Sequence, residues 1–170
     1  MREFIGGVVA AMGVGLIFAY GLLHSGLVPA NADAKPSGLE LWAASTSLQA
    51  TLRSAAPKGP NPIALTDANL YEGIKLYDQH CVLCHGTSRG AASAVARGLY
   101  PAPPQLAIEG VEDDPEGASY WRIKHGVRLT GMPSWGASLT DQQIWTLALF
   151  LKQMDKLPAG PRAAWIQARN

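Results

Sequence analysis

The sequence Cys81-Val82-Leu83-Cys84-His85 lies near the middle of a chain of 170 residues. Two cysteines three positions apart can add their thiols to the two vinyl groups of a haem, and the histidine that follows then faces the iron. Cys-x-x-Cys-His is the attachment signature of a covalent, c-type haem. Cys81 and Cys84 are the only cysteines of the sequence, so one site uses both. The motif therefore predicts one covalent haem c with His85 as an iron ligand.

Three other interpretations of the two cysteines agree less well with the sequence. A zinc site requires about four ligands, usually in two clusters, and the sequence has no second cluster of Cys and His. A thioredoxin-like redox pair is expected beside a βαβ pattern, which the sequence lacks. A disulfide between residues this close closes a very short loop and would stabilise the fold little.

The composition is that of one domain with additional segments. A chain of 170 residues is long enough for this organisation. The formal net charge is +1, whereas surfaces that bind nucleic acid usually carry a marked basic patch. We therefore expect no nucleic-acid partner.

The N-terminal segment is strongly apolar, because positions 4–32 contain no Asp, Glu, Lys or Arg. As a helix, Phe4 to Val28 would extend roughly 37 Å, which exceeds a bilayer core of about 30 Å. The alternative is a signal segment, since Ala30-Asn31-Ala32 is a small-x-small site. Signal h-regions are shorter, at about 7–15 residues. We therefore expect residues 1–32 to be a retained transmembrane anchor that crosses the membrane once.

Residues 33–65 are interpreted as a connector. Ser37 and Glu40 form a capping box, which predicts a helix over residues 38–56. This helix is either a spacer that lies over the next domain or the membrane surface, which we favour, or a docking helix for a partner subunit. Lys58-Gly59-Pro60-Asn61-Pro62 then interrupts regular structure.

Two helices are well specified within residues 66–157. Thr66 or Asp67 is the expected cap of a helix that leads into Cys81. Thr140 and Gln143 form a capping box for the last helix. Each helix has one apolar face. These faces consist of Leu70, Gly73, Ile74 and Tyr77 in the first helix, and of Ile144, Leu147, Ala148, Leu151 and Met154 in the last.

A third helix is expected after Asp114, with this residue as N-cap and Pro115 at the first helical position. Lys124, His125 and Gly126 are typical of its C-terminal end, where basic residues and glycine are favoured. No segment has the alternation of a β-strand. The sequence therefore predicts an all-α fold, followed by a C-terminal tail over residues 158–170.

The combination resembles a class I c-type cytochrome. A helix that leads into Cys-x-x-Cys-His, a later Gly131-Met132-Pro133 loop and a terminal amphipathic helix carry this resemblance, which covers roughly residues 65–156. Gly73 matches the small residue at which the family's first and last helices cross. Pro104, with Pro103 as competitor, resembles the proline whose carbonyl accepts a hydrogen bond from the ligand histidine. Such a bond fixes the tautomer of His85 and raises its basicity.

Met132 is the expected sixth iron ligand, because it lies in a loop that proline stiffens. His125 is the main competitor, and an open iron site is the third possibility. A His/Met ligand pair leaves no position for a substrate and raises the reduction potential, so an electron carrier is expected and not an enzyme. The other methionines belong to the membrane segment or to the last helix: Met1, Met12 and Met154.

The resemblance also implies a location and partners. Haem is attached to such motifs outside the cytoplasm, so we expect a bacterial inner-membrane protein with its haem domain in the periplasm. It would carry single electrons between a respiratory or dehydrogenase donor and a terminal oxidase or other acceptor. Its partners would be redox proteins, with no small-molecule substrate. The alternatives are a fixed haem subunit of a larger membrane complex and a ligand-binding haem sensor or peroxidase-like enzyme. As a flexible coil, residues 33–65 would let the domain move about 30 Å from its anchor.

Overall fold

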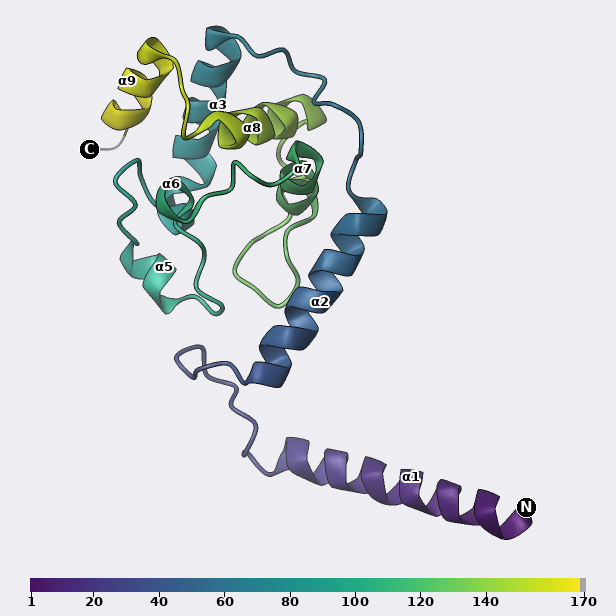
Figure 1. The fold of residues 1–170 in the computed structure, drawn as a ribbon. Helices are drawn as coiled ribbons and strands as arrows, with labels where there is room; N and C mark the ends of the chain where they lie inside the picture. Colours follow the sequence, from purple (N-terminus) through teal and green to yellow (C-terminus); the bar gives the residue numbers. More distant parts are fainter. Residues whose placement is uncertain (169–170) are drawn as a thin grey trace. The chain divides into compact units, whose positions relative to one another are not determined.

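The computed structural model describes residues 1–168, and this part of the chain is all-α, without a β-strand. It divides into two compact units, Met1–Ala34 and a second unit that begins at Lys35. Figure 1 shows the ribbon. The helices are α1 (Arg2–His24), α2 (Gly38–Ala55), α3 (Asp67–His80), α4 (Val82–His85), α5 (Ala94–Gly98), α6 (Leu106–Glu109), α7 (Glu116–His125), α8 (Asp141–Gln153) and α9 (Ala159–Gln167).

Helix α1 forms most of the first unit. Its most apolar stretch has a mean hydropathy of 2.0, and a helix of 23 residues extends about 35 Å. Arg2 and Glu3, both in its first turn, are its only Arg, Lys, Asp or Glu side chains. The helix is therefore compatible with a membrane anchor, although a signal sequence near the N-terminus has the same properties.

The core of the second unit lies where α3 crosses α8, with α7 packed against α8. Both caps predicted for these two helices are confirmed. The Thr66 hydroxyl accepts a hydrogen bond from the backbone N–H of Asn69, and Thr140 forms a reciprocal capping box with Gln143. The apolar faces then meet. The most completely buried large side chains include Leu70, Tyr77, Ile144, Leu147 and Phe150.

Gly73 lies at the crossing of α3 and α8. A Cβ atom at this position would lie 2.6 Å from Cβ of Phe150 and 3.0 Å from the carbonyl oxygen of Thr146. Real Cβ atoms do not approach other carbons this closely. The small residue therefore allows the two helix backbones to touch, as the family resemblance implied.

Gly73→Ala is expected to lower the free energy of unfolding by about 1–3 kcal/mol, because the added methyl group must push α3 and α8 apart. Chemical denaturation of the haem-loaded protein measures this change. Gly98→Ala in α5 is the matched control, since its Cβ would meet no atom within 4 Å. Equal stability of the two variants would contradict the close crossing.

Helix α7 begins one position later than the sequence predicted. Pro115 occupies the cap position, and no side chain caps the helix. The predicted cap, Asp114, instead accepts a hydrogen bond from Nη1 of Arg122 at 2.6 Å. The prediction was wrong here because a charged partner within the same helix competes with the backbone N–H groups for the carboxylate. The predicted C-terminal end is confirmed, with Gly126 at φ 67°.

Helix α2 packs against α7. It begins with the predicted capping box of Ser37 and Glu40. Leu52 and Ala56 are buried against Ala118 of α7. At its other end, the carboxylate of Glu40 accepts a hydrogen bond of 2.6 Å from the hydroxyl of Tyr100. The helix therefore lies over the domain that follows it, which agrees with the interpretation of α2 as a spacer.

Residues 158–168 contain a helix where the sequence indicated only a tail. Helix α9 packs beside α3. Its Trp165 is 5 % exposed and belongs to the main core. Helix α8 already ends at Gln153, five residues before Pro158, so the predicted stop at this proline was wrong; Pro158 instead stands at the N-cap of α9. Residues 169 and 170 of the predicted tail lie outside the described residues.

Candidate cofactor site

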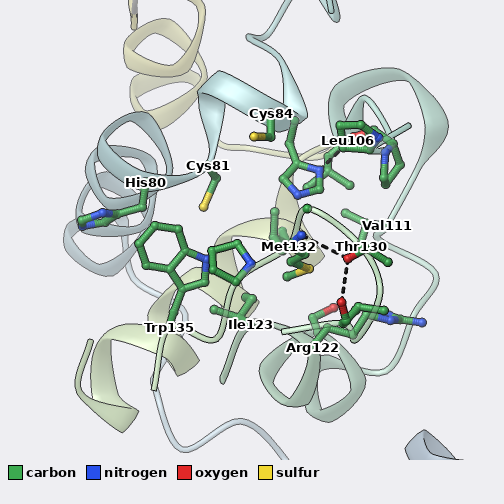
Figure 2. A pocket seen from close by; sticks show the side chains of 18 of the residues that line it. His80, Cys81, Cys84, Leu106, Val111, Arg122, Ile123, Thr130, Met132 and Trp135 are labelled. Atoms are coloured by element: carbon green, nitrogen blue, oxygen red, sulfur yellow. Dashed lines mark hydrogen bonds between the residues drawn. The ribbon is translucent and has the colours of Figure 1, made fainter. Parts of the chain in front are cut away.

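The second unit contains a cavity of about 580 Å³. Its walls come from the end of α3, the α4 turn, the proline-rich segment 101–104, α7, and the loop that follows α7. All five predicted site residues line this cavity: Cys81, Cys84, His85, Pro104 and Met132. Figure 2 shows Cys81, Cys84 and Met132 together with several neighbouring side chains.

The Cys-x-x-Cys-His motif forms a single helical turn. Cys81 ends α3 and caps α4, and its carbonyl oxygen accepts hydrogen bonds from the backbone N–H groups of Cys84 at 3.1 Å and His85 at 2.9 Å. Gly86 then reverses the chain with φ 79°, a conformation that glycine adopts without strain. The turn therefore holds both thiols and the imidazole at the same cavity.

The ring of His85 is fixed by the proline-rich segment. Its Nδ1 lies 2.9 Å from the carbonyl oxygen of Pro104. Because a carbonyl only accepts, Nδ1 carries the proton and Nε2 keeps its lone pair. Burial lowers the pKa of His85, which favours the neutral, metal-ligating form. The competing carbonyl of Pro103 accepts instead from Nε2 of Gln105 at 3.1 Å.

Cys81 lacks the lowered pKa of a reactive redox pair. Both are free thiols in the structure. Burial raises the pKa of the Cys81 thiol to about 12, whereas reactive cysteine pairs require a lowered pKa. Among the residues that the structure describes, no three His, Cys, Asp or Glu side chains gather into a metal site. This finding disagrees with the zinc alternative.

Met132 is held at the cavity by hydrogen bonds within its own loop. Its N–H donates to Oγ1 of Thr130 at 3.0 Å, and this hydroxyl donates to the carbonyl oxygen of Val127 at 2.7 Å. The N–H of Val127 donates back to the carbonyl oxygen of Met132 at 3.2 Å. Figure 2 shows the hydroxyl of Thr130 between its partners. These hydrogen bonds close the loop from Val127 to Met132 and fix the backbone that carries the thioether side chain.

The competitors of Met132 lie elsewhere or have other partners. His125 is exposed at the end of α7, with its ring 4.9 Å from that of Trp121. Met154 is 8 % exposed within the helical core, as predicted. A further histidine, His80, lines the cavity but directly precedes Cys81 in the chain, and its ring lies 5.1 Å from that of Trp135.

Two further cavity residues were not expected as site residues. Leu48 lines the cavity from α2. The sequence shows that Leu48 is apolar, but it does not show that α2 packs on the cytochrome domain and brings this side chain to the cavity. Arg122 also lines the cavity and pairs with Asp114 at 2.6 Å.

The side chains of the cavity fit a covalently attached haem. Two thiols, one imidazole and one thioether line one cavity, whose size is within the range of about 300–1,000 Å³ that is typical of ligand pockets. Leu106, Ile123, Leu147 and Leu151 supply apolar walls. Sulfur and imidazole are also the donors with which proteins hold haem iron.

A comparison with protein families agrees with this chemistry. Residues 68–151 match the family described as cytochrome c oxidase, cbb3-type, subunit III. No curated protein matches the chain significantly. Among solved structures, the chain is similar to a chain of the reducing HAO-like protein complex of Kuenenia stuttgartiensis, with 21 % identity and a TM-score of 0.46. This match covers 61 % of the present chain and 54 % of that chain.

The family match and the donor set point to the same conclusion. The matched residues include the whole Cys-x-x-Cys-His turn and Met132. Residues 68–151 therefore form a c-type cytochrome domain, and the cofactor of this domain is haem c.

Proposed function

We propose that this protein is a membrane-tethered electron carrier with one haem c per chain. Cys81 and Cys84 would hold the haem through their thiols, and His85 and Met132 would ligate its iron. The observation that carries the proposal is the single cavity that the Cys-x-x-Cys-His turn and Met132 share. A cytochrome c domain transfers electrons, and a complete set of protein ligands favours this role over catalysis.

The chain's own residues account for the expected chemistry. A bound haem supplies an iron that alternates between the ferric and ferrous states. Nε2 of His85 would offer its lone pair to the iron. The carbonyl oxygen of Pro104 accepts a hydrogen bond from the Nδ1–H group, and this bond raises the basicity of the ring. Met132 contributes a thioether, which favours the ferrous state. Apolar walls such as Leu147 and Leu151 exclude water and raise the potential further.

We also propose that α1 anchors the protein in the bacterial inner membrane and that the cytochrome domain faces the periplasm. Support comes from the length and apolar composition of α1 and from the attachment of c-type haem outside the cytoplasm. The electron donor would be a quinol-oxidising complex or a dehydrogenase. The acceptor would be a terminal oxidase or a further cytochrome.

A second candidate function is a permanent haem-bearing subunit of a larger membrane complex. The matched family is described as a subunit of an oxidase, and this description favours the candidate. In that case α1 and the outer face of α2 would serve as assembly surfaces. Transfer would then occur between fixed partners and not by diffusion between them.

Native sizing after extraction in a mild detergent separates the two candidates. We expect the haem-stained protein to migrate alone, with one haem per chain and a reversible one-electron titration. Migration together with large subunits would favour the fixed subunit. Rapid binding of carbon monoxide by the reduced protein would contradict an iron with both His85 and Met132 as ligands. It would favour a haem sensor or a peroxidase-like enzyme.

A further inference from the structure

Helix α9 lies beyond the residues that match the cytochrome family, yet it packs against the helix that leads into the haem-attachment turn. The ring of Trp165 lies 5.1 Å from that of Tyr77 in α3 and 5.2 Å from that of Phe150 in α8, both in edge-to-face geometry. Tyr77 and Phe150 are themselves 5.6 Å apart. Three aromatic rings from three helices therefore contact one another, and Trp165 completes the group.

Tyr77 connects these rings to the attachment turn. Its side chain is 0 % exposed. Its hydroxyl lies 3.0 Å from the carbonyl oxygen of His85 and 2.9 Å from that of Gly86. Because a carbonyl oxygen only accepts, the Tyr77 hydroxyl donates a hydrogen bond to these carbonyls. The position of this ring therefore determines how the backbone of His85 is held.

The same backbone sets the direction of the His85 imidazole. The ring donates from Nδ1 to the carbonyl oxygen of Pro104, and Nε2 of Gln105 donates to the carbonyl oxygen of Cys84 at 3.1 Å. The hydroxyl of Tyr77 thus bonds the helical core to the ligand turn, in addition to the bonds that this turn makes with Pro104 and Gln105. Loss of the Trp165 ring would leave a void beside Tyr77 and allow its ring to tilt away from both carbonyls.

We propose that α9 is a positioning element of the haem site. Trp165 holds the ring of Tyr77 at the place where its hydroxyl fixes the carbonyl groups of His85 and Gly86, and this keeps the imidazole of His85 aligned with Pro104. The proposal rests on the proposed function in one respect, because it takes His85 as an iron ligand. None of the described residues of α9 lines the cavity, so the action is indirect.

The test follows the Nδ1 proton of His85 in the full-length, haem-loaded and reduced protein by NMR, as it exchanges with deuterium. Trp165→Ala and Tyr77→Phe are each expected to raise the exchange rate at least tenfold. The double variant should exchange no faster than Tyr77→Phe alone, since both changes act through one hydroxyl. Arg162→Ala, at an exposed position of α9, should exchange at the wild-type rate.

Other outcomes overturn the positioning role. If Trp165→Ala lowers the melting temperature but leaves the exchange rate unchanged, Trp165 is a core residue only. If the effects of the two substitutions multiply in the double variant, they act independently. Trp165→Phe retains part of the ring contact, so it remains informative if the alanine variant does not fold, and it should show a smaller increase. Tyr77→Phe keeps the aromatic packing and removes only the hydroxyl. An unchanged exchange rate in this variant would therefore show that the hydroxyl does not position His85.

Failure of the proposed function would give a different result. If His85 is not an iron ligand, its ring protons lack the strong haem ring-current shift in the wild type and in every variant. That result overturns both proposals. A normal ring-current shift together with an exchange rate that does not respond to Trp165 or Tyr77 overturns the positioning role alone.

Discussion

Met132→Ala is expected to lower the reduction potential by on the order of 0.1 V or more, within the roughly 0.8 V that axial ligands control. The thioether stabilises ferrous iron, and its loss removes this preference. The vacated position should then bind carbon monoxide in the reduced protein. Potentiometric titration and carbon monoxide difference spectra measure the two effects, and the ferric absorption band of iron–thioether ligation should disappear.

The control for this substitution is the exposed competitor. His125→Ala should leave the potential, the thioether band and the lack of carbon monoxide binding as in the wild type. A loss of low-spin ligation in His125→Ala, with no change in Met132→Ala, would reverse the assignment. Met154→Leu conserves most of the side-chain volume in the core and should also keep the wild-type spectrum.

Replacement of both Cys81 and Cys84 by alanine is expected to abolish covalent attachment of haem. No other cysteine is present in the sequence to form a thioether bond. The mass of the denatured chain should then equal that of the polypeptide alone, and haem staining after denaturing electrophoresis should be lost. Stability should fall as well, because a cavity of about 580 Å³ would lose the group that fills it.

The single variants serve as internal comparisons for the double variant. Cys81→Ala and Cys84→Ala each keep one thioether position, so both should retain some covalent haem with a shifted absorption band. Covalent haem in the double variant would show that attachment occurs elsewhere on the chain. Cys81 and Cys84 would then not be the attachment points.

Local signals made much of this structure predictable from the sequence. The attachment motif is five consecutive residues, so its chemistry does not depend on distant contacts. The capping boxes of Ser37 and Thr140 act within four residues, and both are present. Gly73 could be identified through the family resemblance, and its close contact with Phe150 gives the physical reason for a small residue.

What the sequence did not indicate depends on contacts between distant segments. The hydrophobicity of Trp165 is visible in the sequence, but its partners are in α3 and α8. Leu48 lines the cavity only because α2 docks on α7 through Leu52. Asp114 is of a residue type that is favoured at helix N-caps. Only the position of Arg122 in the fold shows that Asp114 forms an ion pair and does not cap the helix.

The docking of α2 also shortens the length of chain between the anchor and the cytochrome domain. Helix α1 ends at His24 and α2 begins at Gly38, so only residues 25–37 remain as a linker between the two helices. A coil of that length has an end-to-end distance of about 20 Å, compared with about 30 Å for the whole connector. If α1 spans the bilayer, the volume that the domain can reach shrinks to about one quarter. A partner in the same membrane would therefore meet a more concentrated supply of reducing equivalents, and one that floats free in the periplasm would be harder to reach.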